Sequence, residues 1–130
     1  MTLYAADTHV IIWYWSGSPR LSATAHQLLD DAFAGRHAIV ISPIVLAELI
    51  LIAEKQRAPL SLPAVIAALT STPAFQLVSL SPSMALHTQQ LTALPDIHDR
   101  LIVAAALTFG ATLITQDRAI TQSGVIPVIW

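Results

Sequence analysis

Five of the eight acidic residues in this 130-residue chain stand within or beside its most apolar segments: Asp7, Glu48, Asp96, Asp99 and Asp117. A carboxylate in apolar surroundings is strongly unfavourable unless a partner compensates its charge. Carboxylates, with no cysteine and no paired histidines beside them, favour Mg²⁺ or Mn²⁺ over Zn²⁺ as that partner. Two such ions about 4 Å apart can activate water and stabilise a leaving oxygen. The chemistry that these residues indicate is therefore phosphodiester hydrolysis.

Glu48 is the clearest of the five acids. A helical glutamate on a solvated face usually has polar companions three and four residues away. Here all four of those positions are apolar: Ile44, Val45, Leu51 and Ile52. We therefore expect a buried Glu48 whose partner is a metal ion shared with other acids.

Each of the other acids also has a purely structural interpretation. Asp96 and Asp99 could be a capping pair at the start of a helix. Asp7 could be an N-cap, and Asp117 a turn residue after a strand. Their joint placement, rather than any one of them, favours a site.

The elements that must position these acids alternate between strands and helices. Strands are predicted at 3–6, 38–41, 75–79, 111–115 and 126–129, and helices at 9–15, 22–34, 43–56, 64–69, 81–94 and 101–109, with Thr8 as the first N-cap. The strands are apolar on both faces, which is typical of a parallel sheet covered by helices on both sides. Pro127 favours an edge position for the last strand. We predict one α/β domain over residues 1–130.

In an open parallel sheet, ligands bind beyond the carboxyl ends of the strands. Asp7 directly follows the first strand, and Asp117 lies two residues after Thr115 at the end of the fourth. Glu48 lies in the helix after the second strand, and Asp99 near the start of the helix before the fourth. All five acids are expected to reach one cleft.

Composition restricts the setting. The net charge is −2, but without the five acids only three remain against six Lys and Arg, so a phosphodiester substrate stays possible. The 55% hydrophobic content and mean hydropathy of +0.65 suggest that part of the surface is covered by another chain. No run approaches the roughly 18 to 20 apolar residues of a membrane helix. Met1–Tyr4 shows no basic segment leading into an apolar core, so we expect a cytoplasmic protein.

The order of the motifs resembles a known family. The chain is similar to PIN domains, and specifically to the toxin ribonucleases of the VapBC toxin–antitoxin class. The similarity spans essentially the whole chain. It is carried by Leu-Tyr-Ala-Ala-Asp7-Thr8-His9, Val45-Leu46-Ala47-Glu48-Leu49, Asp96-Ile97-His98-Asp99-Arg100 with the apolar run after it, Thr115-Gln116-Asp117 and the closing Ile-Pro-Val-Ile-Trp130.

The resemblance implies a single PIN-like domain with a central parallel sheet and a Mg²⁺- or Mn²⁺-dependent endoribonuclease activity. Its partners would be RNA, a cognate antitoxin and a second copy of the chain, with no membrane. The implied catalytic and metal-binding acids are Asp7, Glu48, Asp99 and Asp117, with Asp96, Thr115, Thr8 and Arg100 as accessory residues.

Several details stay open within that resemblance. Many relatives carry Asp-Pro-Phe-Asp where this chain has Asp-Ile-His-Asp, and His98 is read as structural or substrate-facing rather than as a ligand. For Arg100, pairing with a neighbouring acid is ranked above contact with phosphate or simple solvation. Trp13, Tyr14 and Trp15 could stack on RNA bases, but packing is the favoured role.

Two other function classes compete with a nuclease. A catalytically silent PIN-like module would bind a partner or RNA only, and its mark would be loss of one of the four acids. A phospho-receiver domain would want a phospho-accepting Asp after the third strand, which here ends in Ser79-Leu80-Ser81. The only lysine is Lys55, which also weakens that alternative.

Overall fold

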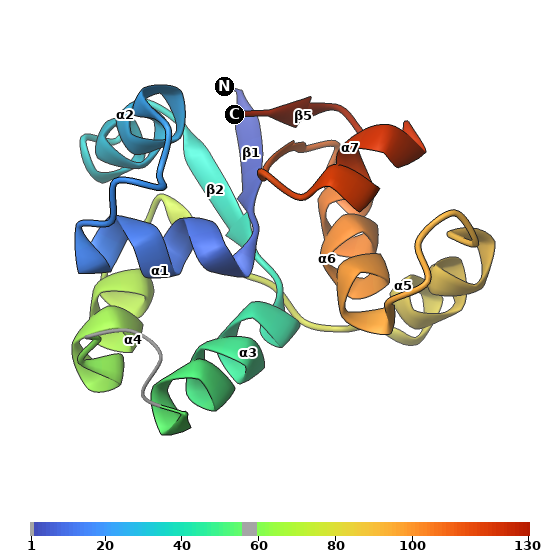
Figure 1. Ribbon diagram of the computed structural model, residues 1–130, viewed down its shortest axis with the longest axis horizontal. Helices are drawn as coiled ribbons and strands as arrows, with labels where there is room; N and C mark the ends of the chain where they lie inside the picture. Colours follow the sequence, from blue (N-terminus) through green and yellow to red (C-terminus); the bar gives the residue numbers. More distant parts are fainter. Residues whose placement is uncertain (1, 56–59) are drawn as a thin grey trace.

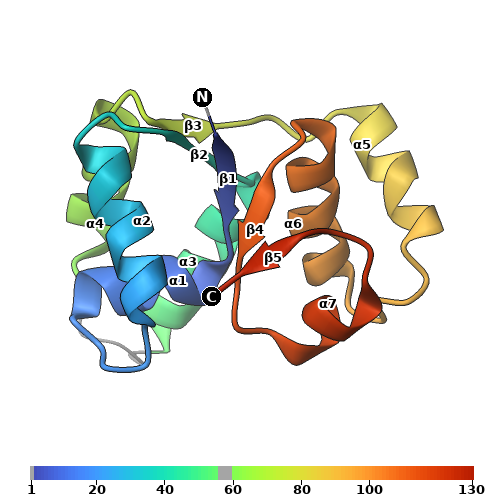
Figure 2. The same ribbon diagram turned by 90° about the horizontal axis from the view of Figure 1, so that it is seen from above.

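A five-stranded parallel sheet forms the centre of the molecule, as described by a computed structural model for residues 2–55 and 60–130. The strands lie in the order β3-β2-β1-β4-β5 (Figure 2). In the central pairings, Tyr4 of β1 lies opposite Ile39 of β2 on one side and Thr112 of β4 on the other. Their bounds are β1 Leu3–Ala6, β2 Ala38–Ile41, β3 Phe75–Leu77, β4 Thr112–Ile114 and β5 Val128–Ile129.

Helices cover the sheet on both sides, as the apolar strands predict. α1, α2 and α4 gather on one side and α5, α6 and α7 on the other, while α3 contacts α1, α4 and α6 (Figures 1 and 2). The helices are α1 Thr8–Ser16, α2 Ala23–Phe33, α3 Pro43–Glu54, α4 Leu62–Ser71, α5 Pro82–His87, α6 Ile97–Thr108 and α7 Arg118–Ser123, with a 3₁₀ helix, η1, at Thr88–Gln90. All four residues of β2 are buried. The α/β prediction is confirmed.

The sheet order reverses beside β1. The chain moves outward from β1 through β2 to β3 and then returns to place β4 on the opposite side of β1. In open α/β sheets, ligands bind at the carboxyl edge where the order reverses in this way. A phospho-receiver domain has the order 2-1-3-4-5 instead, so that alternative is wrong for this chain.

Several predicted elements differ from those observed. The strands expected over 75–79, 111–115 and 126–129 are shorter, at Phe75–Leu77, Thr112–Ile114 and Val128–Ile129. The helix expected over 81–94 ends at His87, where the Thr88 hydroxyl donates a hydrogen bond of 2.5 Å to the Ala85 carbonyl and η1 begins. The expected 101–109 helix starts earlier, at Ile97, because Asp96 caps it. The short helix expected at 64–69 extends over Leu62–Ser71. Gln56, the expected end of the Glu48 helix, lies outside the described residues.

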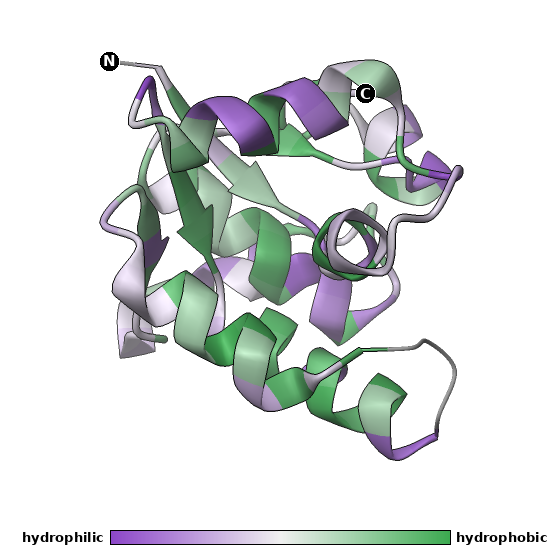
Figure 3. Ribbon diagram, turned by 90° about the vertical axis from the view of Figure 1, so that its left-hand side faces the viewer, coloured by the Kyte–Doolittle hydropathy of each residue, from purple (hydrophilic) through white to green (hydrophobic). Residues whose placement is uncertain are grey.

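The apolar sequence of α3 is only partly buried. Figure 3 shows the helices on either side of its grey segment, α3 and α4, as largely hydrophobic. Ile50 and Leu51 of α3 are 43% and 47% exposed. No helix within the two described ranges combines the length and the hydropathy needed to cross a membrane.

Candidate active site

Asp7 lies at the reversal point of the sheet, between the carboxyl ends of β1 and β4. It is the N-cap of α1, and its Oδ1 accepts a hydrogen bond of 2.7 Å from the Thr8 amide. Its Oδ2 accepts one of 2.7 Å from the Thr115 hydroxyl. The Thr115 oxygen in turn accepts a hydrogen bond of 3.0 Å from the Asp117 amide. Buried Thr115 therefore connects two of the acids, and Asp7 rather than Thr8 is the cap.

Asp117 is the N-cap of a helix, α7, that has no counterpart among the predicted elements. Its Oδ1 accepts a hydrogen bond of 2.9 Å from the Ile120 amide, which caps α7. The turn interpretation was therefore incomplete. The aspartate three residues before Ile120 and the glycine at 124 are the sequence signals that could have revealed this helix.

Glu48 is not the unpartnered buried carboxylate that its neighbours indicated. Its side chain is 26% exposed, its Oε1 accepts a hydrogen bond of 2.6 Å from the Thr8 hydroxyl, and its Oε2 lies 3.5 Å from Nδ1 of His98. The expectation fails because α3 leaves apolar residues such as Ile50 and Leu51 exposed, so an apolar run does not mean burial all round. Buried Thr8 thus fixes Glu48 to α1, a role that nothing in the sequence indicated.

Asp96 and Asp99 stand at the start of α6. Asp96 is exposed and acts as the N-cap, since its Oδ1 accepts a hydrogen bond of 2.7 Å from the His98 amide. The capping interpretation of Asp96 is therefore confirmed. Asp99 follows in the first turn of the helix.

Electrostatics unite the five acids into what we call the acidic cluster: Asp7, Glu48, Asp96, Asp99 and Asp117. Burial is the largest cause that raises the pKa of Asp99 to about 6, and the negative charges of Asp117, Asp96, Asp7 and Glu48 contribute to that increase in that order of size. Burial also raises the pKa of Asp7, while the hydrogen bonds from Thr115 and Thr8 oppose that increase. Acids far apart in the sequence thus influence one another's protonation.

The acids are close enough to repel one another, but their side chains are not arranged to coordinate a metal ion. Within residues 2–55 and 60–130, no three Asp, Glu or His side chains lie at metal-binding distance of each other. Like charges without a cation disfavour close approach. Asp7 and Glu48 instead accept hydrogen bonds from Thr115 and Thr8. The all-carboxylate donor set nevertheless fits Mg²⁺ or Mn²⁺ chemically.

Arg100 does not pair with a neighbouring acid, so the interpretation ranked first for it, an ion pair with such an acid, is wrong. Its Nε donates a hydrogen bond of 2.5 Å to the Leu94 carbonyl, and its Nη1 lies 3.5 Å from the Thr88 carbonyl. Leu94 lies between η1 and α6, and Arg100 supplies a donor for its carbonyl, whereas the Thr88 carbonyl of η1 also accepts a hydrogen bond from the Leu91 amide. Arg100 thus contacts the backbone here, and its accessory role stays a prediction.

A pocket of about 190 Å³ opens beside Asp7, and we call it the Asp7 pocket. Of the three aromatic residues in α1, only Trp13 lines it. Tyr14 and Trp15 instead form an aromatic cluster with Phe33 and Phe75, as the packing interpretation predicted. The pocket is lined by Asp7, His9, Val10, Trp13, Gln116 and Asp117.

Comparison with known proteins agrees with this architecture. The family model described as the PIN domain matches residues 4–124. The chain is 34% identical over 124 residues to "Ribonuclease VapC22" of Mycobacterium tuberculosis (strain ATCC 25618 / H37Rv), with 91% of this chain and 89% of that protein covered.

Solved structures match over nearly their full length. VapBC2 from Rickettsia felis, bound to a fragment of promoter DNA, has a TM-score of 0.74 at 18% identity, with 98% of both chains covered. DNA-bound VapBC from Salmonella typhimurium has a TM-score of 0.70 at 22% identity and covers 99% of this chain and 98% of that one. At such identities the structures establish the fold alone. From the family model and the VapC22 similarity together, the chain belongs to the PIN domain family as a VapC-like member.

Proposed function

We propose that this chain is a metal-dependent endoribonuclease and the toxin component of a type II toxin–antitoxin pair. The observation that carries the proposal is geometric: Thr115 is hydrogen-bonded to Asp7 and to the Asp117 amide, and Thr8 to Glu48, at the reversal point of the sheet, where open α/β folds bind ligands. The raised pKa of Asp99, caused first by burial and then by the charges of the other four acids, supports the same site. The similarity to a protein named a ribonuclease supports the same reaction.

Asp7, Glu48, Asp99 and Asp117 would hold the Mg²⁺ or Mn²⁺ ion. When bound, such an ion polarises a phosphate oxygen and lowers the pKa of water. The chain's own contribution is orientation. A carboxylate offers about four acceptor positions, and the hydrogen bonds from Thr8 and Thr115 occupy two of those on Asp7. The remaining positions stay available to a cation, while both oxygens are held in place.

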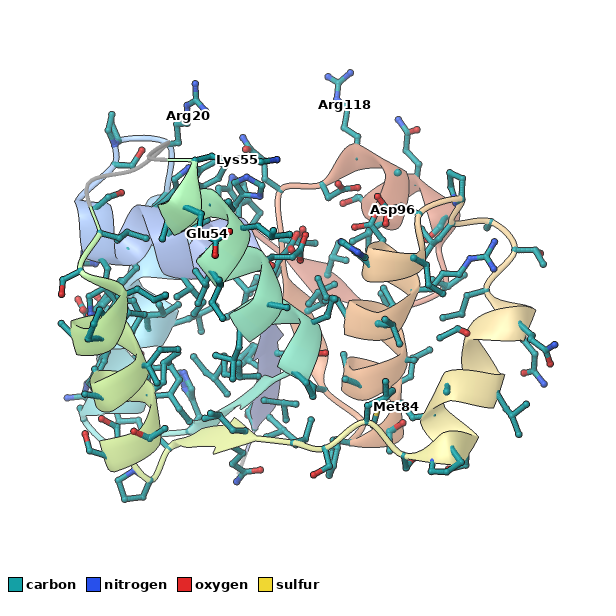
Figure 4. The ribbon with its side chains drawn as sticks, turned by 90° about the horizontal axis from the view of Figure 1, so that it is seen from below. Arg20, Glu54, Lys55, Met84, Asp96 and Arg118 are labelled. Atoms are coloured by element: carbon teal, nitrogen blue, oxygen red, sulfur yellow. The ribbon has the colours of Figure 1, made fainter. Side chains whose placement is uncertain are left out.

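An RNA strand needs positive groups beside an acidic site. Arg20, Lys55 and Arg118 are exposed and form no ion pair with another described residue. In Figure 4 all three lie along the same edge of the molecule, on the side that also carries Asp96. Cations at this edge would contact phosphates of a strand whose scissile bond lies over the acidic cluster.

The proposed protein partners are an antitoxin and a second copy of the chain. Exposed Ile50 and Leu51 on α3 form an apolar surface that contact with another chain would cover. The matching structures include VapBC assemblies, which supports an antitoxin as one such partner.

One observation favours a second candidate, a catalytically silent PIN-like binding module. No three acids of the described chain lie at metal-binding distance. A silent module would bind RNA or protein without cleaving it. All four acids of the implied set are present, which favours the nuclease.

The deciding experiment is induced expression of three forms followed by mapping of new RNA ends. Wild type should arrest growth and produce new ends, whereas Asp7→Asn at equal abundance should do neither, because the amide keeps the shape but loses the charge. Asp31→Asn is the matched control, since Asp31 pairs with Arg36 on the surface, and it should behave as wild type. Equal toxicity of wild type and Asp7→Asn would refute the nuclease.

A further inference from the structure

We propose that the Asp7 pocket binds one unstacked nucleobase of the RNA strand, next to the scissile phosphate. Trp13 would be the stacking surface, and Gln116 would contact the edge of the base. This inference rests on the proposed nuclease function and adds a specificity element to it. The pocket shares Asp7 and Asp117 with the acidic cluster, so a nucleotide whose phosphate lies over the cluster has its base within reach.

Trp13 is braced by two other rings. Its ring lies 5.9 Å from that of Trp130 in an edge-to-face arrangement at 68° and 5.4 Å from that of His9 at 47°. Neither neighbour is stacked parallel on it. Such bracing fixes the indole at the wall of the pocket, and a fixed aromatic surface loses little entropy when a base stacks on it.

The neighbouring aromatic residues of α1 are already engaged. Tyr14 is stacked on Phe33 with ring centres 5.9 Å apart and an angle of 16°. Trp15 packs edge-to-face against Phe33 at 5.8 Å. Their faces serve the aromatic cluster, which leaves Trp13 as the aromatic residue of this helix that lines the pocket.

Gln116 supplies the group that could distinguish bases. Its side chain is exposed and makes no hydrogen bond to another residue in the described part of the chain. The backbone around it is fixed, because Thr115 binds Asp7 and Asp117 caps α7. An amide both donates and accepts hydrogen bonds, as the edges of nucleobases do.

The charge of the pocket selects the ligand class. Asp7 and Asp117 line the pocket, so an anionic group is disfavoured there when no cation is bound to them. A neutral, planar ligand with hydrogen-bonding edges fits a space bounded by an indole, an imidazole and an amide. A nucleobase meets each of these requirements, and the phosphate attached to it would remain outside.

RNA binding without cleavage provides the test. In a fluorescently labelled short single-stranded RNA, an abasic residue replaces one nucleotide at a time. Affinity is measured in chelator, with Asp99→Asn as the parent protein. Asp99 does not line the pocket. Loss of one base should weaken binding by about 5- to 150-fold, since stacking of one base contributes about 1–3 kcal/mol.

The variant series assigns that loss to Trp13. In the parent protein, Trp13→Leu should weaken binding of the intact RNA by a similar factor and should remove the effect of the abasic residue, whereas Trp13→Phe should keep most of both. Trp15→Leu makes the same chemical change in the aromatic cluster and should leave the abasic profile unchanged. Gln116→Met should bind with little loss but with a flattened preference among the four bases.

The outcomes separate this inference from the proposed function. Suppose that wild type cleaves RNA and that the abasic residue weakens binding to Trp13→Leu as much as it weakens binding to the parent protein. This result refutes the base pocket but not the proposed nuclease function. An abasic effect that depends on Trp13 in a protein that binds RNA but never cleaves it overturns the nuclease and supports the pocket. If Trp13→Leu melts at a lower temperature than the parent protein, its weaker RNA binding could reflect unfolding. In that case Trp13→Phe and Gln116→Met decide whether the pocket binds a base. An unchanged base preference in Gln116→Met refutes the reading role of Gln116.

Discussion

The two ends of α1 lie in regions of opposite character. At its N-terminal end, Asp7 belongs to the acidic cluster and Thr8 is hydrogen-bonded to Glu48 of that cluster. There burial, and after it the charges of the other acids, raise the pKa of Asp99 to about 6. At its last turn, Tyr14 and Trp15 belong to the aromatic cluster with Phe33 and Phe75, where the ring centres of the two phenylalanines are 4.9 Å apart. One region carries groups that repel each other and the other is held by apolar contact. A helix that apolar contacts stabilise at one end can therefore hold mutually repelling charges at the other.

Two aspartates show the same difference at the level of single groups. Asp30, beside the aromatic cluster, accepts a hydrogen bond of 2.7 Å from the Tyr14 hydroxyl and lies 3.1 Å from His26. Burial and the hydrogen bond to Asp30 raise the pKa of Tyr14, so the hydroxyl stays protonated. Asp99 instead faces four other acids. The Asp30 carboxylate links α1 and α2 through its hydrogen bond with Tyr14, whereas the Asp99 carboxylate lies among like charges that a cation would neutralise.

Removing an aromatic ring should produce the largest effect, and on stability alone. Phe75→Ala should lower the free energy of unfolding by about 3–5 kcal/mol, the usual cost of deleting a buried phenylalanine. Urea denaturation measures the loss. RNA cleavage per folded molecule should stay at the wild-type level, and a loss of cleavage in fully folded Phe75→Ala would show that the two regions are coupled.

Metal binding at the acidic cluster should change the free energy of unfolding by nearly as much as the loss of Phe75. Mg²⁺ or Mn²⁺ at one hundred times its Kd should add about 2.7 kcal/mol to the free energy of unfolding, which raises Tm by several degrees. Glu48→Gln should show little of this shift and should lose cleavage, while Asp31→Asn should show all of it. A full metal shift in Glu48→Gln would mean that Glu48 only anchors Thr8.

Loss of the Thr115 hydroxyl should weaken the site moderately. Thr115→Val removes the hydrogen bond to Asp7 and the acceptor for the Asp117 amide, so metal affinity or cleavage should fall by about 10- to 100-fold. Thr115→Ser keeps the hydroxyl and should stay near wild type. Calorimetric metal titration distinguishes them. Similar affinities for the two variants would contradict the orienting role.

The pH dependence of stability should show the smallest effect. The pKa of Asp99 in the folded protein, about 6, lies above its ordinary value of 3.8, so the native state binds more protons between these values. In chelator, stability should therefore fall as pH rises from about 4 to about 6, by on the order of 1 kcal/mol because solvent screens this partly exposed group. Asp99→Asn should reduce this fall and leave the part that comes from Asp7, whose pKa is also raised by burial. Wild-type stability that rises through the same interval would contradict the shift.

Local patterns in the sequence determined the strands, the sheet type and the neighbourhood of the acids. Strands apolar on both faces required cover on two sides, and β1 and β4 placed Asp7 and Asp117 at one edge, because parallel strands share a carboxyl end. The motifs around Glu48 and Asp99 also identified the family. These features depend on residues near one another in the chain, so their signals survive in the sequence.

Only the tertiary structure decided how the side chains meet. It joined Thr115 to Asp7 across 108 residues and Thr8 to Glu48 across 40, directed Arg100 to backbone carbonyls and left Trp13, but not Trp15, beside the acids. Hydrogen-bond partners of this kind are chosen by the packing of helices whose contact faces depend on the whole fold. An apolar run such as that of α3 cannot reveal which of its faces stays exposed, because burial depends on the elements packed against it.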